Sequence, residues 1–201
     1  MKTSFDIRPG SRAFLHVLLV IGLCSCSVAR TNPARIEIPQ EQANYSWWLG
    51  IDFFPVHEQI RGIPVSQLDA SWHLASELTK EVIPSGILYE SGSDIMKEAE
   101  LSFSRSGDFN NDGVEDLVLV GIYQDKAEKR GTFILILTKD RAGKWQKTFL
   151  EQLGRLTFAA LSQTDPMEIW FCVGCEFGAY LLWDKEKGQY LLEPFHEEEG
   201  G

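Results

Sequence analysis

Residues 108–121 read DFNNDGVEDLVLVG, and this stretch decides the fold more than any other. Its first half alternates oxygen-bearing side chains around a glycine, as a tight calcium-binding loop does. Its second half, from Leu117, is an apolar run of the kind found in buried strands. The loop therefore leads directly into a β-strand, and an ion bound there would lie at the rim of a β-sheet.

The spacing of the oxygen donors in this loop suits Ca²⁺, which takes roughly six to eight oxygen ligands at about 2.3–2.6 Å. Donors stand at loop positions one, three, five, seven and nine. The expected ligands are Asp108, Asn110, Asp112, Val114 through its carbonyl, and Asp116. Gly113, which follows the third ligand, is expected to have a positive φ, a conformation that is costly for residues with a Cβ.

Two other structures fit part of this pattern. An EF-hand requires a glutamate at position twelve, where this chain has Leu119, so the loop is not an EF-hand. A plain β-turn around Asp112 and Gly113 needs no metal. Such a turn does not require carboxylates at the other alternate positions, so calcium is the expected ligand and the metal-free turn is the alternative.

The segment Gly107–Val118 resembles the FG-GAP and VCBS repeats of integrin-type β-propellers, whose aspartate-rich loop opens the first strand of a blade. The resemblance covers about a dozen residues in a single good copy. It implies the same five calcium ligands and a Glu115 side chain that points away from the ion.

From Leu117 onward, apolar runs of strand length are separated by turns that contain Gly or Asp. These runs cover residues 117–123, 132–138, 145–150, 156–161, 168–173, 179–184 and 189–192. Residues 116–135 and 168–182 resemble each other, which indicates a blade-sized repeat. A closed propeller needs at least four blades, more than this chain can supply. The expected fold is mainly β: an antiparallel meander of two blade-like sheets, propeller-like but incomplete, with one N-terminal amphipathic helix.

That helix is expected at about residues 66–82. Apolar residues recur there at spacings of three and four, as on one face of a helix. They are Val65, Leu68, Trp72, Ala75, Leu78 and Val82. Ser66 and Asp69 form a pair like a capping box, and Pro84 ends the run.

Residues 1–25 have the features of a secretory signal peptide, with basic residues before an apolar stretch that is too short to span a membrane. Leu23-Cys24-Ser25-Cys26 resembles a bacterial lipobox, which implies that Cys26 is lipidated and begins the mature chain. Ser27 directly follows Cys26, and in the lipoproteins that this segment resembles such a residue accompanies sorting to the outer membrane. Cleavage after Ala29 is the alternative. Either route exports the protein, and an outer-membrane lipoprotein facing the periplasm or the exterior is expected.

The mature chain divides into three parts. Residues 26–43 lack apolar periodicity and are expected to be a lipidated tether. Residues 44–195 are expected to form one mainly β domain, and residues 196–201 an acidic tail.

Removal of residues 1–25 takes away three basic residues and one acidic residue, so 16 basic and 28 acidic residues remain and the formal net charge changes from −10 to −12. Nucleic acid is therefore not an expected partner. Attachment to a membrane would depend on the lipid anchor rather than on a basic surface.

Two further groups of residues suggest structural or binding roles. Cys172 and Cys175 are the remaining thiols after export, and an oxidising envelope favours a disulfide between them. No further Cys or His pair at metal spacing accompanies them, so zinc is not expected. Trp47 and Trp48 would point to opposite faces of a strand, which makes one of them a candidate for a binding surface.

The sequence contains neither Gly-x-Ser-x-Gly nor His-Glu-x-x-His, and Asp69 and His73 are an i, i+4 pair of a kind that is usually only solvated. The leading hypothesis is a non-catalytic envelope lipoprotein whose calcium-stabilised β domain binds a protein or a glycan. The alternative is a calcium-dependent hydrolase of envelope polymers that uses carboxylates such as Asp94, Glu98 or Glu100.

Overall fold

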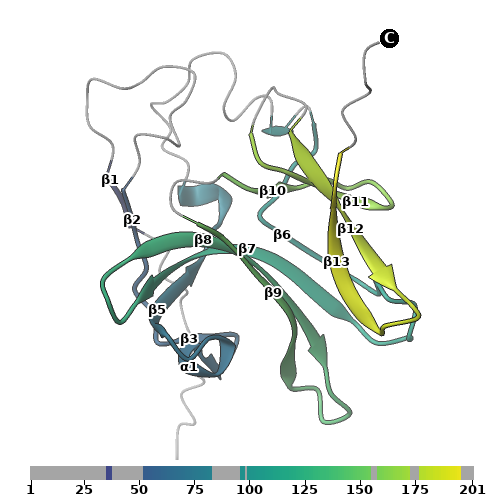
Figure 1. The fold of residues 1–201 in the computed structure, drawn as a ribbon, viewed down its shortest axis with the longest axis horizontal. Coiled ribbons are helices and arrows are strands. Elements are labelled where there is room, and N and C mark those ends of the chain that lie inside the picture. Colours follow the sequence, from purple (N-terminus) through teal and green to yellow (C-terminus); the bar gives the residue numbers. More distant parts are fainter. Residues whose placement is uncertain are drawn as a thin grey trace, which may run out of the picture. The chain divides into compact units, whose positions relative to one another are not determined.

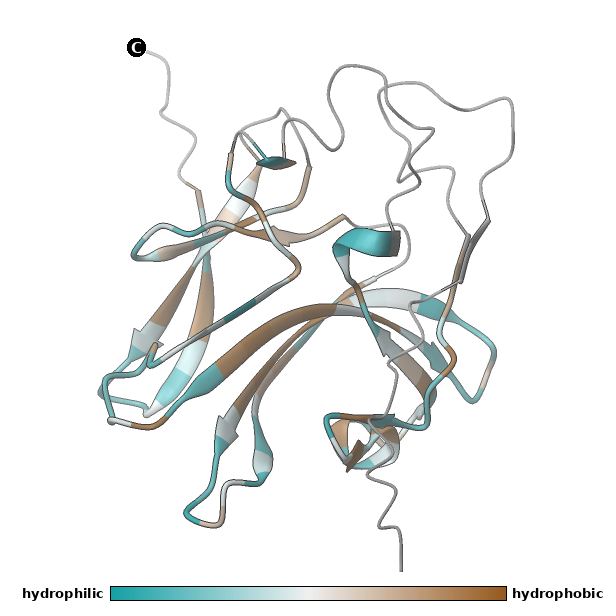
Figure 2. Cartoon of the chain, turned by 180° about the vertical axis from the view of Figure 1, so that it is seen from behind, coloured by the Kyte–Doolittle hydropathy of each residue, from teal (hydrophilic) through white to brown (hydrophobic). Residues whose placement is uncertain are grey.

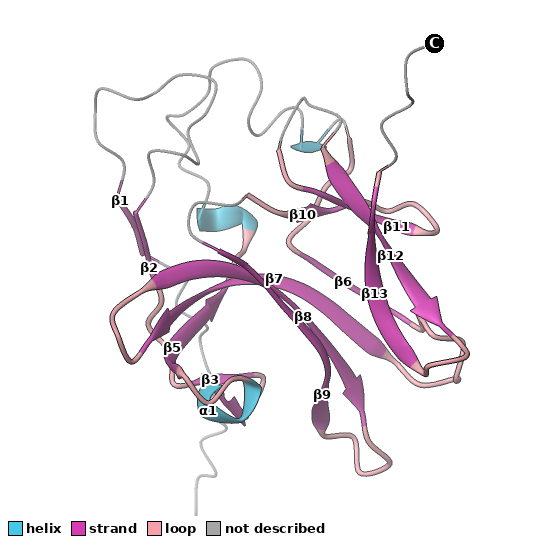
Figure 3. Ribbon diagram, viewed as in Figure 1, coloured by secondary structure: helices cyan, strands magenta, loops and turns pink. Residues whose placement is uncertain are grey.

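The structure, a computed structural model, describes residues 35–37, 52–82, 96–97, 99–154, 158–172 and 177–195. These residues form a mainly β protein in which paired strands run antiparallel (Figure 3). The two larger sheets have five and four strands, and neither closes into a barrel. The expected fold class, two antiparallel blade-like sheets, is therefore confirmed.

The first sheet is built around the long hairpin of β7 (Asp116–Asp125) and β8 (Arg130–Lys139), which crosses the centre of Figure 1. β9 (Trp145–Gly154) continues the meander beside β8. The other edge of β7 pairs with two short strands. β6 (Ser104–Gly107) lies along its N-terminal half and β5 (Trp72–Glu77) along its C-terminal half.

The two central strands β7 and β8 are almost entirely buried. A strand covered on both faces has no need for alternating polar residues, which explains their continuous apolar runs. The apolar colour in Figure 2 follows the central strands, whereas the turns are hydrophilic. At Gly121, a Cβ atom would lie 2.3 Å from the Phe133 ring and 2.7 Å from the carbonyl oxygen of Ser76, so only glycine fits between these neighbours.

The second sheet is a meander of four strands in chain order. They are β10 (Ala160–Leu161), β11 (Met167–Trp170), β12 (Gly178–Asp184) and β13 (Gln189–Pro194). The two similar segments of the sequence each form a hairpin in a different sheet, β7–β8 in the first and β11–β12 in the second. The repeat in the sequence thus corresponds to two separate meanders.

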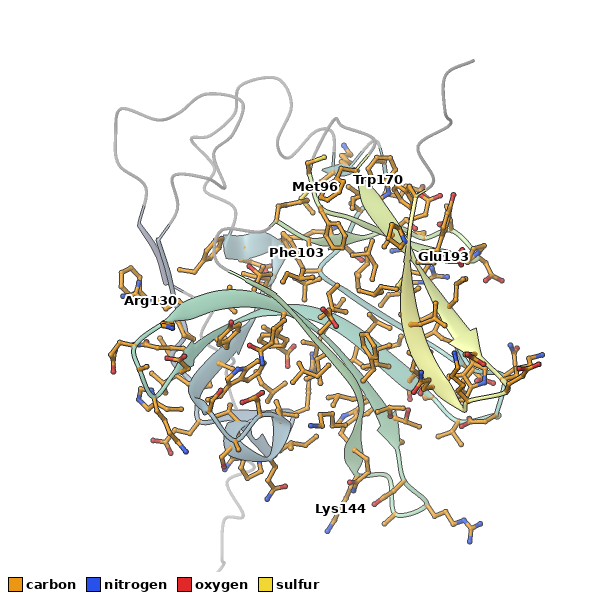
Figure 4. The ribbon with its side chains drawn as sticks, viewed as in Figure 1. Met96, Phe103, Arg130, Lys144, Trp170 and Glu193 are labelled. Atoms are coloured by element: carbon orange, nitrogen blue, oxygen red, sulfur yellow. The ribbon has the colours of Figure 1, made fainter. Side chains whose placement is uncertain are left out.

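One apolar cluster lies between the two sheets. It contains the even-numbered face of the central hairpin, including Val118, Val120 and Ile134, together with Ile169 and Leu181 from the second sheet. These side chains are at most 6% exposed. Met96 and Phe103, labelled in Figure 4, belong to the same cluster. Burial of this shared face holds the two sheets together.

A second apolar cluster covers the odd-numbered face of the same hairpin. It includes Phe133 and Leu135 from β8 and residues from the segment that precedes β5. Those residues come from β3 (Gln59–Ile60), β4 (Ile63–Pro64) and α1 (Val65–Leu68). β2 (Asp52–Phe54) lies before them in the chain, and its Phe53 packs against the first cluster. Trp72 is fully buried there and stacks on Tyr123, with ring centroids 4.6 Å apart.

The prediction of a helix at residues 66–82 is wrong. α1 has only four residues, and its N-cap Pro64 makes no side-chain capping bond, so the proposed Ser66–Asp69 cap is absent. Strand β5 follows at Trp72–Glu77, and Lys80–Val82 form a single 3₁₀ turn, η2. Asp69 is the C-cap residue of α1 and His73 lies in β5, so the two do not share a helical face.

A β-bulge explains why this segment imitates a helix. The pairing of β5 with β7 shifts register between Trp72 and Leu74, which inserts one extra residue. With one extra residue in the strand, the side chains return to the same face of the sheet after three positions instead of two. Trp72 and Ala75 therefore both enter the second cluster, while Leu78 enters the first. The apolar residues of this segment therefore show spacings of three and four although the chain is extended and not helical.

The tether expected at residues 26–43 also needs one correction. Arg35–Glu37 form β1, which pairs antiparallel with β2. The isoleucines at positions 36 and 38 alternate with charged and proline residues, and this two-residue period is typical of a strand. Strand pairing thus begins before Asn44. The signal peptide, Cys26, Trp47, Trp48, Cys175 and the tail at 196–201 lie outside the described residues.

Candidate functional site

The expected calcium loop connects β6 to β7 at one end of the first sheet. Gly107 pairs with Asp116, and this pair closes the base of the loop. The loop therefore lies at a sheet rim, as its sequence predicts. Gly113 has a φ of +81° and Asn111 a φ of +59°, so two left-handed residues turn the chain back, and the expected positive φ at Gly113 is confirmed.

Within the loop, side-chain oxygens accept hydrogen bonds from backbone N–H groups. Asp108 accepts from the N–H groups of Asp112 and Gly113 through its two carboxylate oxygens, at 3.0 and 2.9 Å. Oδ1 of Asn110 accepts from the Asp112 N–H at 3.0 Å, and Oδ1 of Asp112 accepts from the Val114 N–H at 2.8 Å. These bonds tie three of the expected ligand side chains to the backbone of the turn.

Asp116 differs from the other loop residues because it is fully buried. Its Oδ2 accepts hydrogen bonds from Oη of Tyr190 at 2.7 Å and from the backbone N–H of Phe109 at 3.1 Å. Its Oδ1 accepts a short hydrogen bond from the hydroxyl of Thr138. One carboxylate thus joins the loop, the strand β8 and the second sheet. A buried carboxylate with several donors satisfies the requirement that buried charge be hydrogen-bonded.

Tyr190, on β13, lies within electrostatic reach of several loop carboxylates. Burial raises the pKa of Tyr190 above its ordinary value of 10.0, and the hydrogen bond to Asp116 raises it further. The negative charges of Asp116, Asp112 and Asp108 add to the increase in this pKa. Three of the expected calcium ligands therefore act electrostatically on one phenol.

The hydrogen bonds leave room for an ion on most of the donors. A carboxylate offers about four lone-pair sites. Asp108 and Asp112 each use two of them in the described bonds, and Asp116 uses three. Asp116 thus has one remaining site, on Oδ1, and can contribute a single oxygen without giving up a donor.

Among the described residues, no group of three or more His, Cys, Asp or Glu side chains is arranged to hold a metal ion.

Glu115 is not part of the hydrogen-bonded loop. Its carboxylate pairs with the ammonium of Lys139 at the end of β8. Lys139 also lies over the ring of Trp145, with Nζ 4.8 Å from the centroid. The loop is therefore connected through one lysine to the start of β9.

The other expected site residues are only partly described. Cys172 follows β11, and its expected disulfide with Cys175 stays a prediction because Cys175 lies outside the described residues. Of the carboxylates suggested for a hydrolase, Glu100 is exposed at a turn with a φ of 51°. Asp94 and Glu98 lie outside the described residues. Asp69 accepts hydrogen bonds from Ser71 and Gln152, which together lower its pKa.

Sequence reasoning missed Thr138 and Tyr190, the two side chains that bind Asp116. They lie 22 and 74 residues away along the chain, so no local spacing connects them to the loop. A lone Tyr in an apolar strand is ordinarily a core residue. The position of Asp116 directly before the apolar run that begins at Leu117 was the one available signal that its carboxylate would be buried.

Comparison with protein-family models, with curated proteins and with solved structures found no match to the chain. The similarity of the loop to FG-GAP and VCBS repeats therefore stays a resemblance of a short segment. Within the described part of the chain, no helix is both long enough and apolar enough to cross a membrane.

Proposed function

We propose that the protein is an exported, non-catalytic cell-envelope lipoprotein whose β domain is stabilised by calcium and binds a protein or a glycan. The observation that supports this best is the loop at residues 108–116. It presents alternating oxygen donors on a preformed turn, and its last member, Asp116, is bonded to both sheets.

The ligands of the ion would be the side chains of Asp108, Asn110, Asp112 and Asp116 and the carbonyl of Val114. All are oxygen donors, which suits a hard cation. The lone pairs left after the internal hydrogen bonds support monodentate contributions, with water completing the shell. Three carboxylates on one short loop repel each other in the absence of a cation, so an ion bound among them would lower the free energy of the folded state.

The expected energetic effect of calcium is modest but useful. External calcium sites have dissociation constants of about 0.1–1 mM. At ten times such a constant, ligand linkage adds about 1.4 kcal/mol to the free energy of unfolding. For a domain of marginal stability, this amount is a meaningful fraction of the total free energy of unfolding.

Export and anchoring follow from the N-terminal sequence. Lipidation at Cys26 would tether the domain to the membrane, and outer-membrane sorting is proposed from Ser27. The formal net charge of −10 opposes binding to nucleic acid and to anionic lipid headgroups, which supports a lipid chain as the membrane contact.

The test is the response of the melting temperature to calcium in wild type, in Asp112→Ala and in Asp140→Ala. Asp140 is the matched control, because its carboxylate also accepts backbone N–H bonds in a turn, from Ala142 and Lys144, but stands outside the loop. We expect calcium to raise the melting temperature of wild type and of Asp140→Ala, and to leave Asp112→Ala unchanged. Equal responses in all three proteins would refute the calcium site.

A further inference from the structure

A surface groove lies between the turn that joins β3 to β4, the helix α1, and the turn that joins β8 to β9. Its volume is about 740 Å³, within the range of small-molecule sites. Six polar or aromatic residues of its lining are Arg61, Gln67, Lys144, Trp145, Gln146 and Lys147. Three of these are cationic, and none of the described residues that line the groove is anionic. This is unusual for a chain with a net charge of −10.

Arg61 is held at one wall of the groove by its backbone and by an ion pair. Arg61 and Gly62 form the two-residue turn of the β3–β4 hairpin, with φ values of 50° and 84°. Turns of this kind favour Asn, Asp or Gly, so an arginine is an unusual occupant. Its Nε and Nη2 donate to the two carboxylate oxygens of Glu77, each at 2.7 Å. A guanidinium has five N–H donors, so three remain for a ligand.

Lys147, on β9, and Lys144, in the turn between β8 and β9, supply two ammonium groups to the groove. Lys147 donates one hydrogen bond to the carbonyl oxygen of Leu68 at 2.6 Å, which leaves two donors. Lys144 is exposed at the tip of the β8–β9 hairpin, where Figure 4 labels it. Lys147 is thus fixed on β9 and Lys144 in the turn that precedes it. Both ammonium groups keep N–H donors that a ligand can use.

Glu77 pairs with Arg61, and two carboxylates on which the lysine charges act accept hydrogen bonds from other donors. Asp140, close enough to Lys144 for the lysine charge to lower its pKa, accepts from the backbone of Ala142 and Lys144. Asp69, whose pKa is lowered in part by Lys147, accepts from Ser71 and Gln152. These carboxylates weaken the long-range positive field of the groove. Recognition would therefore depend on short-range hydrogen bonds from the cations.

The remaining lining residues suit a sugar. Trp145 is half-buried, with the Nζ of Lys139 4.8 Å from the centroid of its ring, so the apolar face of a pyranose would stack on the part of the ring that Lys139 does not cover. The amides of Gln67 and Gln146 both donate and accept hydrogen bonds, as hydroxyl groups require. A nucleic acid is disfavoured, because its many phosphates would be repelled by the acidic remainder of the chain.

We propose that this groove binds a saccharide that carries a carboxylate, with Arg61, Lys144 and Lys147 as donors to the carboxylate and Trp145 as the stacking surface. The inference rests on the proposed function because it names the ligand class of the binding domain. It does not depend on the calcium loop, whose ligands lie at residues 108–116.

The test is titration calorimetry of the purified full-length chain with two matched pairs of probes. The first pair is trigalacturonate and its fully methyl-esterified form, and the second is 3′-sialyllactose and its methyl ester. Within each pair, only the first member carries a carboxylate. Each pair is titrated in EDTA and again with calcium, so that binding through a bridging ion is recognised.

We expect at least one acidic probe to bind about tenfold more tightly than its neutral counterpart in EDTA, since a charge-assisted hydrogen bond is lost with the carboxylate. Lys144→Gln and Lys147→Gln should each weaken this binding about tenfold. Lys126→Gln is the control for Lys147, because Lys126 donates to the Ala70 carbonyl in the same way but does not line the groove. Lys185→Gln, at the exposed β12–β13 turn, is the control for Lys144.

The proposal is overturned if no acidic probe binds better than its neutral partner in either pair, or if the control variants weaken binding as much as the groove variants. Failure here leaves the calcium-dependent melting of wild type and Asp112→Ala unaffected. The two proposals can therefore fail separately.

Discussion

The hydroxyl of Tyr190 on β13 donates a hydrogen bond of 2.7 Å to Oδ2 of Asp116 on β7, across 74 residues of chain. Because Asp116 also accepts from Thr138 and from the backbone of Phe109, this one carboxylate connects the loop to both sheets. The same residue is the last expected calcium ligand. The stability of the loop and the packing of the two sheets are therefore coupled through Asp116.

Substitution of Tyr190→Phe should lower the free energy of unfolding by about 1–3 kcal/mol, because it removes a donor from a buried carboxylate. Urea denaturation at neutral pH measures this change. Tyr180→Phe is the control, since Tyr180 is only partly buried and packs against Phe195. Equal losses in the two variants would show that the hydrogen bond to Asp116 contributes nothing specific.

Alkaline pH should destabilise wild type more than Tyr190→Phe. The pKa of Tyr190 is raised in the folded protein, by burial first and then by Asp116, above its ordinary value of 10.0. The folded state thus keeps a proton that the unfolded state releases, so this contribution is fully present below pH 10 and is lost as the pH rises above it. Chemical denaturation between about pH 9 and 11.5 should give a steeper loss for wild type. Parallel curves would contradict the prediction.

Replacement of Gly121→Ala should destabilise the central hairpin by about 1–3 kcal/mol, because the added methyl group meets the Phe133 ring and the Ser76 carbonyl. The double variant Gly121→Ala, Phe133→Leu tests the cause. It removes the clash with the ring but keeps the 2.7 Å approach to the carbonyl oxygen, so we expect a non-additive and partial rescue. Strict additivity of the two changes in urea denaturation would argue against this contact.

Lipidation at Cys26 predicts that Cys26→Ser moves the exported protein from the detergent phase to the aqueous phase in a phase-separation assay. An acyl chain contributes about 0.8 kcal/mol per buried methylene, so its loss should be decisive. Cys24→Ser, two residues earlier in the same segment, is the control and should partition like wild type. An aqueous wild-type protein would favour the alternative cleavage after Ala29.

The strands from Leu117 onward could be predicted from the sequence because their signals are local. The observed strands β7, β8, β12 and β13 overlap the predicted apolar runs, and Gly188 lies in the turn between β12 and β13, as expected. The left-handed Gly113 could be predicted for the same reason, since a tight turn after alternating oxygen donors restricts the backbone within a few residues.

The segment at residues 65–82 could not be predicted correctly because its apolar spacing has two structural explanations. A helix and a bulged strand both return to the same face after three residues. The choice between them depends on the edge of β7, with which β5 pairs from Gly121 to Asp125. That partner is distant in sequence, and its availability cannot be recognised from the segment itself.

From residue 108 onward, the sequence by itself determined most of where the chain extends and where it turns, because periodicity, glycine and the alternating oxygens act over a few neighbouring residues. Only the tertiary structure decided that Asp116 is buried beneath Tyr190, that Trp72 lies in a strand, and that Arg61 and Lys147 line one groove. These relationships join residues that are tens of positions apart. Their physical basis is the burial of shared apolar faces, which depends on the whole fold rather than on any single segment.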